Sequence, residues 1–208
     1  MKLVDLSLTE FAQVLGSDAP APGGGSAAAL SAANGISLTT MVCELTLGKK
    51  KYAEFEAEIA QVHAESARLQ ESLLAAIDKD TEAFNLVSAV FDMPKETEED
   101  KAARREAMQQ ALKEATKSPY GMMEDILAAL QTTQKAVGKS NTNAASDLGV
   151  AVLNLKAGLQ GAWLNVLINL SGVKDEAFVA DYRSKGEELL QKGCALADEI
   201  YQEILKVV

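Results

Sequence analysis

Two aspartates and a glycine-rich loop are the features of this 208-residue sequence best suited to chemistry. Asp80 falls on the seam of a long helical stretch whose apolar residues recur every three or four positions. A carboxylate on an otherwise buried stripe must be paired, protonated or functional. Two interpretations of Asp80 therefore remain open, a structural partner across the helix pair and a functional group.

Asp147 stands at the head of a second polar stripe, on the stretch that precedes Leu170. At 100° per residue, one side of this predicted helix collects small and hydrogen-bonding residues. These residues are Asp147, Asn154, Gly158, Gly161, Asn165 and Asn169. The stripe is consistent with close helix packing over the glycines with asparagine cross-links, and equally with a polar cleft headed by a carboxylate.

Three consecutive glycines, Gly23, Gly24 and Gly25, lead into Ser26 and a run of small residues. Ser26 is predicted to cap the following helix, whose first N–H groups lack partners and carry partial positive charge. Free N–H groups at a helix start can bind an anion, although a tight turn with a cap would have the same sequence. No Gly-Lys-Ser/Thr follows, so the loop is not a Walker A motif.

The remaining chemistry in the sequence is limited. Lys49, Lys50 and Lys51 form the densest positive cluster, which is either a solvated surface or a site for an anionic ligand tail. The only histidine is His63, which excludes a His-rich metal site and argues against a Ser-His-Asp triad, because His63 would have to be its base. Acid–base catalysis would therefore fall to carboxylates, and Asp80 and Asp147 are the candidates.

The elements that must position these residues are all predicted to be helical, in one domain spanning residues 1–208. Between Ala27 and Gly35 nearly every side chain is small, which predicts a buried helix, closing near Gly48, at the centre of a bundle or of a dimer core. It is too rich in Ser, Thr and Asn for a membrane span. The expected helices cover residues 7–16, 26–48, 52–91, 97–117, 120–138, 147–170 and 175–205, with breaks expected at Pro94 and Pro119.

Composition limits the function classes. The formal net charge of −10 argues against sequence-independent binding of nucleic acid, which needs a basic face. Cys43 and Cys194 form no CxxC pair and have no metal-binding spacing. The first residues lack the layout of a signal peptide, so a cytoplasmic protein is expected.

Four segments together resemble the cyclodeaminase/cyclohydrolase family, which comprises methenyltetrahydrofolate cyclohydrolases and the C-terminal half of formiminotransferase-cyclodeaminases. They are PAPGGGSAAAL, MVCELTLGKKKY, FDMPKETEEDKAARREAMQQALKEAT and SNTNAASDLGVAVL with GAWLNVLIN. The resemblance runs in order from about Phe11 to Asn169. It departs at Ser140, where the family pattern leads us to expect glycine.

The resemblance implies an all-helical fold, at least a homodimer, and a folate pocket beside the glycine loop. It implies no metal and no cofactor beyond the folate substrate, whose tail carries one or several glutamates. Asp147 or Asp80 is expected to activate water or relay a proton. The residues expected to bind the substrate are Pro22, Gly23, Gly24, Gly25, Ser26, Asn141, Asn165 and Asn169, with Lys49, Lys50 and Lys51 on the tail carboxylates.

The reaction that the resemblance favours is hydrolysis of 5,10-methenyltetrahydrofolate to 10-formyltetrahydrofolate, because no transferase half accompanies the domain. Cyclodeamination of formiminotetrahydrofolate, with release of ammonia, is the alternative enzyme activity. A folate-binding helical dimer without activity is a third interpretation. Neither nucleic acid nor a membrane is expected as a partner.

Overall fold

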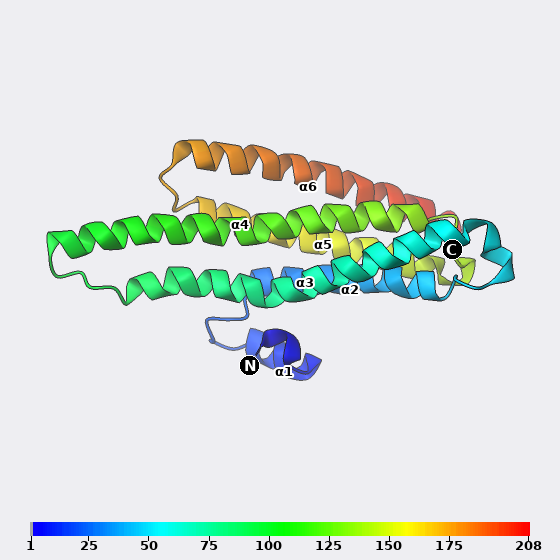
Figure 1. Cartoon of the computed structure of the whole chain (residues 1–208), viewed down its shortest axis with the longest axis horizontal. Coiled ribbons are helices and arrows are strands. Elements are labelled where there is room, and N and C mark those ends of the chain that lie inside the picture. The colour runs from blue at the N-terminus through cyan, green and yellow to red at the C-terminus, as the bar shows by residue number, and fades with distance from the viewer. Residues whose placement is uncertain (1) are drawn as a thin grey trace.

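A computed structural model describes residues 2–208, which form six α-helices and contain no β-strand (Figure 1). The predicted all-helical fold is thus confirmed. The α-helices are α1 (Leu8–Leu15), α2 (Gly24–Glu44), α3 (Glu56–Phe91), α4 (Glu98–Ala136), α5 (Ala145–Leu170) and α6 (Glu176–Ile204). Three short 3-10 helices are η1 (Leu3–Asp5), η2 (Lys50–Phe55) and η3 (Thr142–Ala144).

Helix α2 lies inside the bundle, where it packs against α5 and α3. Its small residues allow a close approach: a Cβ at Gly35 would lie 2.7 Å from the Ala151 carbonyl oxygen, and one at Gly158 would lie 2.9 Å from that of Ala28. The glycines of the α5 stripe therefore serve helix packing. By length and composition α2 could cross a membrane, but 56% of its apolar window is buried in the bundle.

The buried residues of helix α3 confirm the apolar seam that the sequence spacing predicts. Its buried residues include Ile59, Val62, Ser66, Leu69, Leu73 and Ala76. The α-helix begins at Glu56 rather than at Tyr52, because the six residues before it form the 3-10 helix η2. Asp80 continues the seam on the next turn.

The predicted break at Pro119 is wrong, because α4 continues through this residue. A proline inside a helix leaves the carbonyl four residues earlier without its usual N–H donor. Here that carbonyl belongs to Ala115, and the side-chain Nδ2 of Asn169 on α5 donates to it at 2.8 Å. The neighbouring helix thus replaces the missing hydrogen bond.

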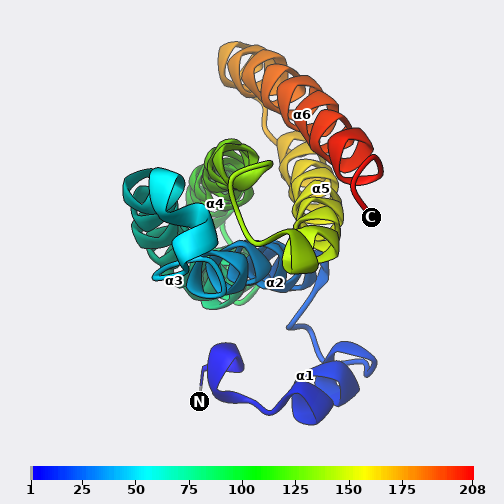
Figure 2. The same cartoon turned by 90° about the vertical axis from the view of Figure 1, so that its right-hand side faces the viewer.

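Two parts of the chain extend away from the central bundle. The tips of α3 and α4 project beyond the ends of α2 and α5 (Figure 1). Helix α1 lies outside the bundle, on the side of α2 and α3 (Figure 2), and its Phe11 is buried in the core. Its predicted capping box is confirmed, since Ser7 and Glu10 exchange hydrogen bonds.

Candidate active site

Asp80 on α3 meets the first turn of α2. Oγ of Ser26, a fully buried residue, lies 3.2 Å from Asp80 Oδ2 and 2.9 Å from the carbonyl oxygen of Ile77. The hydroxyl has one proton, so these two acceptors compete for it. A Cβ at Gly25 would lie only 2.0 Å from Asp80 Oδ1. The carboxylate therefore occupies the space that a side chain at Gly25 would need.

The predicted capping role of Ser26 is wrong. The N-cap is Gly23, and α2 begins at Gly24, so Ser26 lies within the first turn. Its hydroxyl is directed across to α3 because the consecutive glycines let the helix start earlier. Ser26 thus fixes the carboxylate of another helix instead of capping its own.

Burial dominates the electrostatics of Asp80. Desolvation raises the pKa of this carboxyl above its ordinary value of 3.8, although hydrogen bonds from the side chain and backbone of Ser26 oppose the shift. The positive end of α2 also faces the carboxylate. The result is a half-buried carboxylate that is a stronger base than a solvated aspartate.

A cavity of about 320 Å³ opens beside Asp80. Its polar wall consists of Gly23, Gly24, Gly25, Asp80, Thr81, Asn165 and Asn169. Its other wall consists of Pro20, Ala21, Ala83, Phe84, Val87, Ala115 and Ile168. A ligand here would meet hydrogen-bonding groups at one side and hydrophobic groups at the other, as is usual for small-molecule sites.

The two asparagines of this cavity each present a free acceptor. Nδ2 of Asn165 donates to the carbonyl of Gly161 at 2.9 Å, and Nδ2 of Asn169 donates to that of Ala115 at 2.8 Å. In residues 2–208 neither Oδ1 accepts a hydrogen bond. Both side chains are therefore held by their donors while their Oδ1 atoms remain available to a ligand.

Two other predicted residues of the loop do not line the cavity. Pro22 is buried outside the lining, and Ser26 contacts Asp80 instead of the open space. The three glycines between them do line it. The loop thus exposes backbone to the cavity at three successive residues.

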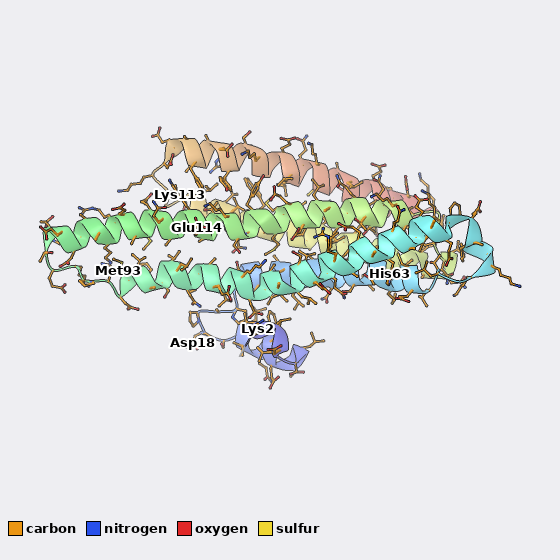
Figure 3. The ribbon with its side chains drawn as sticks, in the orientation of Figure 1. Lys2, Asp18, His63, Met93, Lys113 and Glu114 are labelled. Carbon is orange, nitrogen blue, oxygen red and sulfur yellow. The ribbon has the colours of Figure 1, made fainter. Side chains whose placement is uncertain are left out.

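The structure places Asp147 far from this cavity. Asp147 and Asn165 are on the same helix, but 18 residues at 1.5 Å each separate them by about 27 Å. Asp147 lies in the first turn of α5, beside the end of α2 where the lysines follow. His63 is also remote, at the opposite end of α3 from the Met93 turn (Figure 3), and its Nε2 lies 2.6 Å from Glu44 Oε1.

Lys49, Lys50, Lys51 and Asn141 lie at the same distant end as Asp147. Lys51 Nζ lies 3.3 Å from Thr142 Oγ1. Both polar atoms of the Asn141 side chain are already hydrogen-bonded, since Nδ2 donates to the Leu45 carbonyl at 3.0 Å and Oδ1 accepts from the Asn143 N–H at 3.1 Å. The structure therefore does not bring these residues together with Asp80.

Sequence reasoning missed the residues that shape the hydrophobic wall. Phe84 and Val87 follow Asp80 by four and seven positions, so they share its side of α3. Phe84 is 44% exposed and Ile168 is 67% exposed. The sequence signal that could have identified Phe84 is its position one turn after Asp80 on the seam. No such signal in the sequence points to Ala115, which lines the same wall from α4.

Known proteins are similar to this chain over most of its length. The formiminotransferase-cyclodeaminase family matches residues 7–188. Methenyltetrahydrofolate cyclohydrolase of Methylorubrum extorquens is 42% identical over 95% of both chains. Formimidoyltransferase-cyclodeaminase of Sus scrofa is 36% identical over 91% of this chain, which spans only 35% of that longer protein.

The fold also matches a solved structure. Formiminotetrahydrofolate cyclodeaminase of Thermotoga maritima superposes with a TM-score of 0.81 and 30% identity, over 99% of this chain and 97% of the other. The relatives of this chain are thus named as enzymes of folate derivatives, and one of them has the same helical architecture. The chain belongs to the formiminotransferase-cyclodeaminase family.

Proposed function

We propose that this chain is a methenyltetrahydrofolate cyclohydrolase, which converts 5,10-methenyltetrahydrofolate and water into 10-formyltetrahydrofolate. The 42% identity to a cyclohydrolase over 95% of both chains supports this reaction. The structural observation that carries it is the half-buried carboxylate of Asp80 between the glycine loop and an open cavity. The reaction needs a base, and it needs a negative charge beside the cationic substrate. The Asp80 carboxylate can supply both.

In the proposed mechanism Asp80 acts as the general base. It accepts a proton from water as the water oxygen adds to the amidinium carbon between N5 and N10. The bond from this carbon to N5 then breaks as the adduct hydroxyl loses its proton and becomes the formyl carbonyl. N5 takes up one proton, which the protonated Asp80 can return to it, and the formyl group stays on N10. One proton is released in each turnover, and Asp80 passes it to solvent to return to its basic form.

The cationic substrate also explains why the carboxylate is half-buried. A positive amidinium beside Asp80 offsets the cost of desolvating the negative charge. Low solvent exposure strengthens this attraction relative to water. The same burial keeps the base close to the reacting carbon.

The cavity walls suit the two halves of a folate. The Oδ1 atoms of Asn165 and Asn169 would accept hydrogen bonds from pterin N–H groups. The hydrophobic wall with Phe84, Val87 and Ile168 would contact the aminobenzoyl ring. Gly24 and Gly25 let the substrate approach the start of α2 closely.

Cyclodeamination is the second candidate, favoured by the structural match to a cyclodeaminase. In that reaction N10 attacks the formimino carbon and ammonia leaves, so the same carboxylate would move the protons. The deciding experiment compares loss of methenyl absorbance with release of ammonia from formiminotetrahydrofolate. We expect the higher kcat/KM with the methenyl substrate; a higher value for ammonia release would contradict the proposal. Folate binding without turnover of either substrate would indicate the non-catalytic dimer.

We also propose that the protein works in the cytoplasm as a homodimer formed through α2 and α5. These helices share an exposed hydrophobic face although α2 is otherwise buried. Its large residues are Met41, Leu45, Val150, Leu153, Leu164 and Ile168. Ile168 also lines the cavity, so a second copy on this face would adjoin the proposed active site.

Light scattering of Leu153→Glu tests the homodimer. We expect a dimeric mass for the wild type and a monomeric mass for this variant, because the introduced charge would be buried in the interface. Leu86→Glu is the matched control, since Leu86 is similarly exposed on α3 outside this face. A monomeric wild type, or dissociation by both variants alike, would contradict the proposed interface.

A further inference from the structure

Asp80 must release one proton in each turnover of the proposed reaction, although the substrate would cover its open side. The cavity of about 320 Å³ beside Asp80 is the proposed folate pocket. Among its described lining residues Asp80 is the only ionisable one, so no second base there can take the proton. Burial raises the pKa of Asp80, which therefore holds a proton more tightly than a solvated aspartate does. The proton needs a route that a bound folate leaves free.

The buried hydroxyl of Ser26 is the only side-chain group in residues 2–208 that hydrogen-bonds to the Asp80 carboxylate. Besides its contact of 3.2 Å with Asp80 Oδ2, Ser26 Oγ lies 2.9 Å from the Ile77 carbonyl oxygen and 3.5 Å from Thr81 Oγ1. A hydroxyl can accept one proton while it donates another. Ser26 can thus accept from protonated Asp80, and a turn about its Cβ–Oγ bond directs its own proton to Thr81.

Thr81 connects the buried serine to a second cavity. It is half-buried and lines both the folate pocket and a separate cavity of about 570 Å³, which we call the outer cavity. At 100° per residue, Thr81 is turned about 100° from Asp80 and about 60° from Asp78 on α3. Asp80 lines the folate pocket and Asp78 lines the outer cavity, so Thr81 lies between the two.

The outer cavity is suited to receive a proton. It contains three carboxylates, from Asp5, Asp78 and Glu82, and one ammonium group, from Lys2. An excess of negative charge around a cavity attracts cations, and hydronium is one of them. The N-terminal segment forms its other wall, since the Leu3 N–H donates to Asp78 Oδ1 at 2.6 Å. A folate in the first cavity would leave this second one to water.

We propose that Ser26 and Thr81 form a proton relay that carries the released proton from Asp80 to water in the outer cavity. This inference rests on the proposed function, in which Asp80 is the base. The O–H bond of protonated Asp80 breaks as Ser26 Oγ takes the proton. Ser26 gives its own proton to Thr81, and Thr81 gives its own to a water molecule. Each hydroxyl ends with one proton, Asp80 is again a carboxylate, and the water has become hydronium.

Other groups near Asp80 are less suited to carry protons. Asn165 and Asn169 line the folate pocket, but their Nδ2 groups donate to backbone carbonyls, and an amide transfers protons far less readily than a hydroxyl. A groove of about 740 Å³ between α3 and α4 shares only Ala83 with the pocket. Alanine has no polar side-chain group, so this groove offers no relay.

Substitutions at Thr81 separate a proton carrier from a side chain that only fills space. Thr81→Ser keeps the hydroxyl, Thr81→Val keeps the shape without it, and Thr81→Ala leaves space for a water molecule. We expect Thr81→Ser to retain kcat within about twofold. Thr81→Val should lower kcat on the order of tenfold, less than loss of the base itself, and Thr81→Ala should lie between them. The reverse order, with Thr81→Val above Thr81→Ala, would indicate packing alone and overturn the relay.

The solvent deuterium isotope effect on kcat reports on the proton itself. It should be larger in Thr81→Val than in the wild type, because proton release then limits turnover. Ser26→Ala breaks the same relay at its first hydroxyl. The double variant Ser26→Ala/Thr81→Val should therefore lose no more activity than the weaker of the two single variants. An unchanged isotope effect, or losses that multiply in the double variant, would contradict a shared route.

The matched control is Thr40→Val. Thr40 lies farther along α2, is also half-buried, and its Oγ1 donates to the hydroxyl of the fully buried Ser66 at 2.9 Å. It thus repeats the contact between a threonine and a buried serine away from Asp80. Thr40→Val should keep the wild-type kcat and isotope effect. Equal losses in Thr40→Val and Thr81→Val would overturn the relay.

Infrared spectroscopy after a pH jump tests the relay without turnover, and so separates it from the proposed function. Saturating 10-formyltetrahydrofolate fills the pocket, and the carboxyl band that is absent in Asp80→Asn shows how fast Asp80 exchanges its proton. We expect slower exchange in Thr81→Val than in Thr40→Val. This result would support the relay even if the wild type converted no methenyltetrahydrofolate. Equal rates would overturn the relay even if the protein is a cyclohydrolase.

Discussion

The two ends of the α2–α5 pair are both polar, but they use their polar groups differently. At one end Asp80 and the Oδ1 atoms of Asn165 and Asn169 face a cavity. At the other end the Asn141 side chain bonds to the backbone of Leu45 and Asn143, and the Thr142 N–H donates to the Tyr52 hydroxyl. A polar cluster thus indicates a binding site only where its atoms remain unsatisfied beside open space.

The pKa values at the two ends differ for the same reason, namely how far the polar groups are hydrogen-bonded. Desolvation raises the pKa of Asp80, because few groups compensate its charge. Hydrogen bonds from the Thr142 side chain and backbone instead lower the pKa of the Tyr52 phenol to about 8. The first end keeps a reactive base, whereas the second is held together by hydrogen bonds.

The largest effect is expected from exchanging the two aspartates for asparagine. Asp80→Asn should lower kcat about 10²- to 10⁴-fold, the usual contribution of a general base. Asp147→Asn should change kcat less than about twofold, because Asp147 lies about 27 Å along α5 from Asn165, which lines the cavity beside Asp80. Steady-state loss of methenyl absorbance measures both. Similar losses for the two variants would remove the distinction between the ends.

Thermal unfolding provides the control for Asp80→Asn. Because the native pKa of Asp80 is raised, the folded state binds its proton more tightly than the unfolded chain. The free energy of unfolding therefore falls as pH rises from 3.8 to the raised pKa of Asp80. Above that pKa the buried negative charge of Asp80 destabilises the folded state. The asparagine variant should consequently unfold at a temperature no lower than the wild type at neutral pH.

Gly25→Ala should have the next largest effect. Its Cβ would occupy the position of the Asp80 carboxylate, so the base must move, and a displacement near 1 Å can cost about 10²-fold in rate. Gly121→Ala is the matched control, because a Cβ there meets nothing within 4 Å. Kinetics with both variants measure the difference. Full activity in Gly25→Ala would show that the carboxylate position does not matter.

The pH dependence of kcat/KM should show the titration of Asp80. A general base works only when deprotonated, so the rate should fall about tenfold per pH unit below its pKa. Since burial raises this pKa, the inflection should lie above 3.8. A profile that stays flat down to pH 3.8 would exclude Asp80 as the base.

Asn141→Ala should affect stability and leave turnover unchanged. It removes the hydrogen bonds to the Leu45 carbonyl and from the Asn143 N–H, which should lower the free energy of unfolding by about 1–2 kcal/mol. Denaturant unfolding and kcat measured on one preparation separate the two effects. A raised KM for the folate without loss of stability would instead place ligand binding at this end.

A double-mutant cycle between Asn169 and Pro119 should give the smallest effect. Asn169→Ala leaves the Ala115 carbonyl without its donor, at a cost of about 1 kcal/mol in unfolding free energy. Pro119→Ala restores the backbone N–H, so the same change should cost less in that background. Denaturant melts of the four proteins measure the coupling. Additive effects would mean that Asn169 does not replace the missing bond.

The sequence was sufficient to predict the all-helical fold, most of the helices and the unusual position of Asp80. Helical spacing identifies which residues share a side of one helix, so Asp80 could be recognised on its seam. The same rule grouped Asp147 with Asn165, but a shared side extends along the whole helix and does not make one site. Distance along α5 is what separates them.

Two local predictions failed because a neighbouring helix decided the outcome. Pro119 does not end α4, since Asn169 from α5 supplies the hydrogen bond that proline cannot make. Ser26 does not cap α2, because the glycine run starts the helix at Gly24 and Asp80 accepts from the serine. Neither contact could be found without knowing which helices are adjacent.

Hydrogen exchange with bound folate tests most directly which end of the bundle is the active site. Backbone amides of the wild type would be compared with and without 10-formyltetrahydrofolate. We predict slower exchange in residues 20–30 and 80–91, and no change in residues 45–55 and 141–150. Protection of the latter two segments with none in the former would contradict the assignment of the site to Asp80 and the glycine loop.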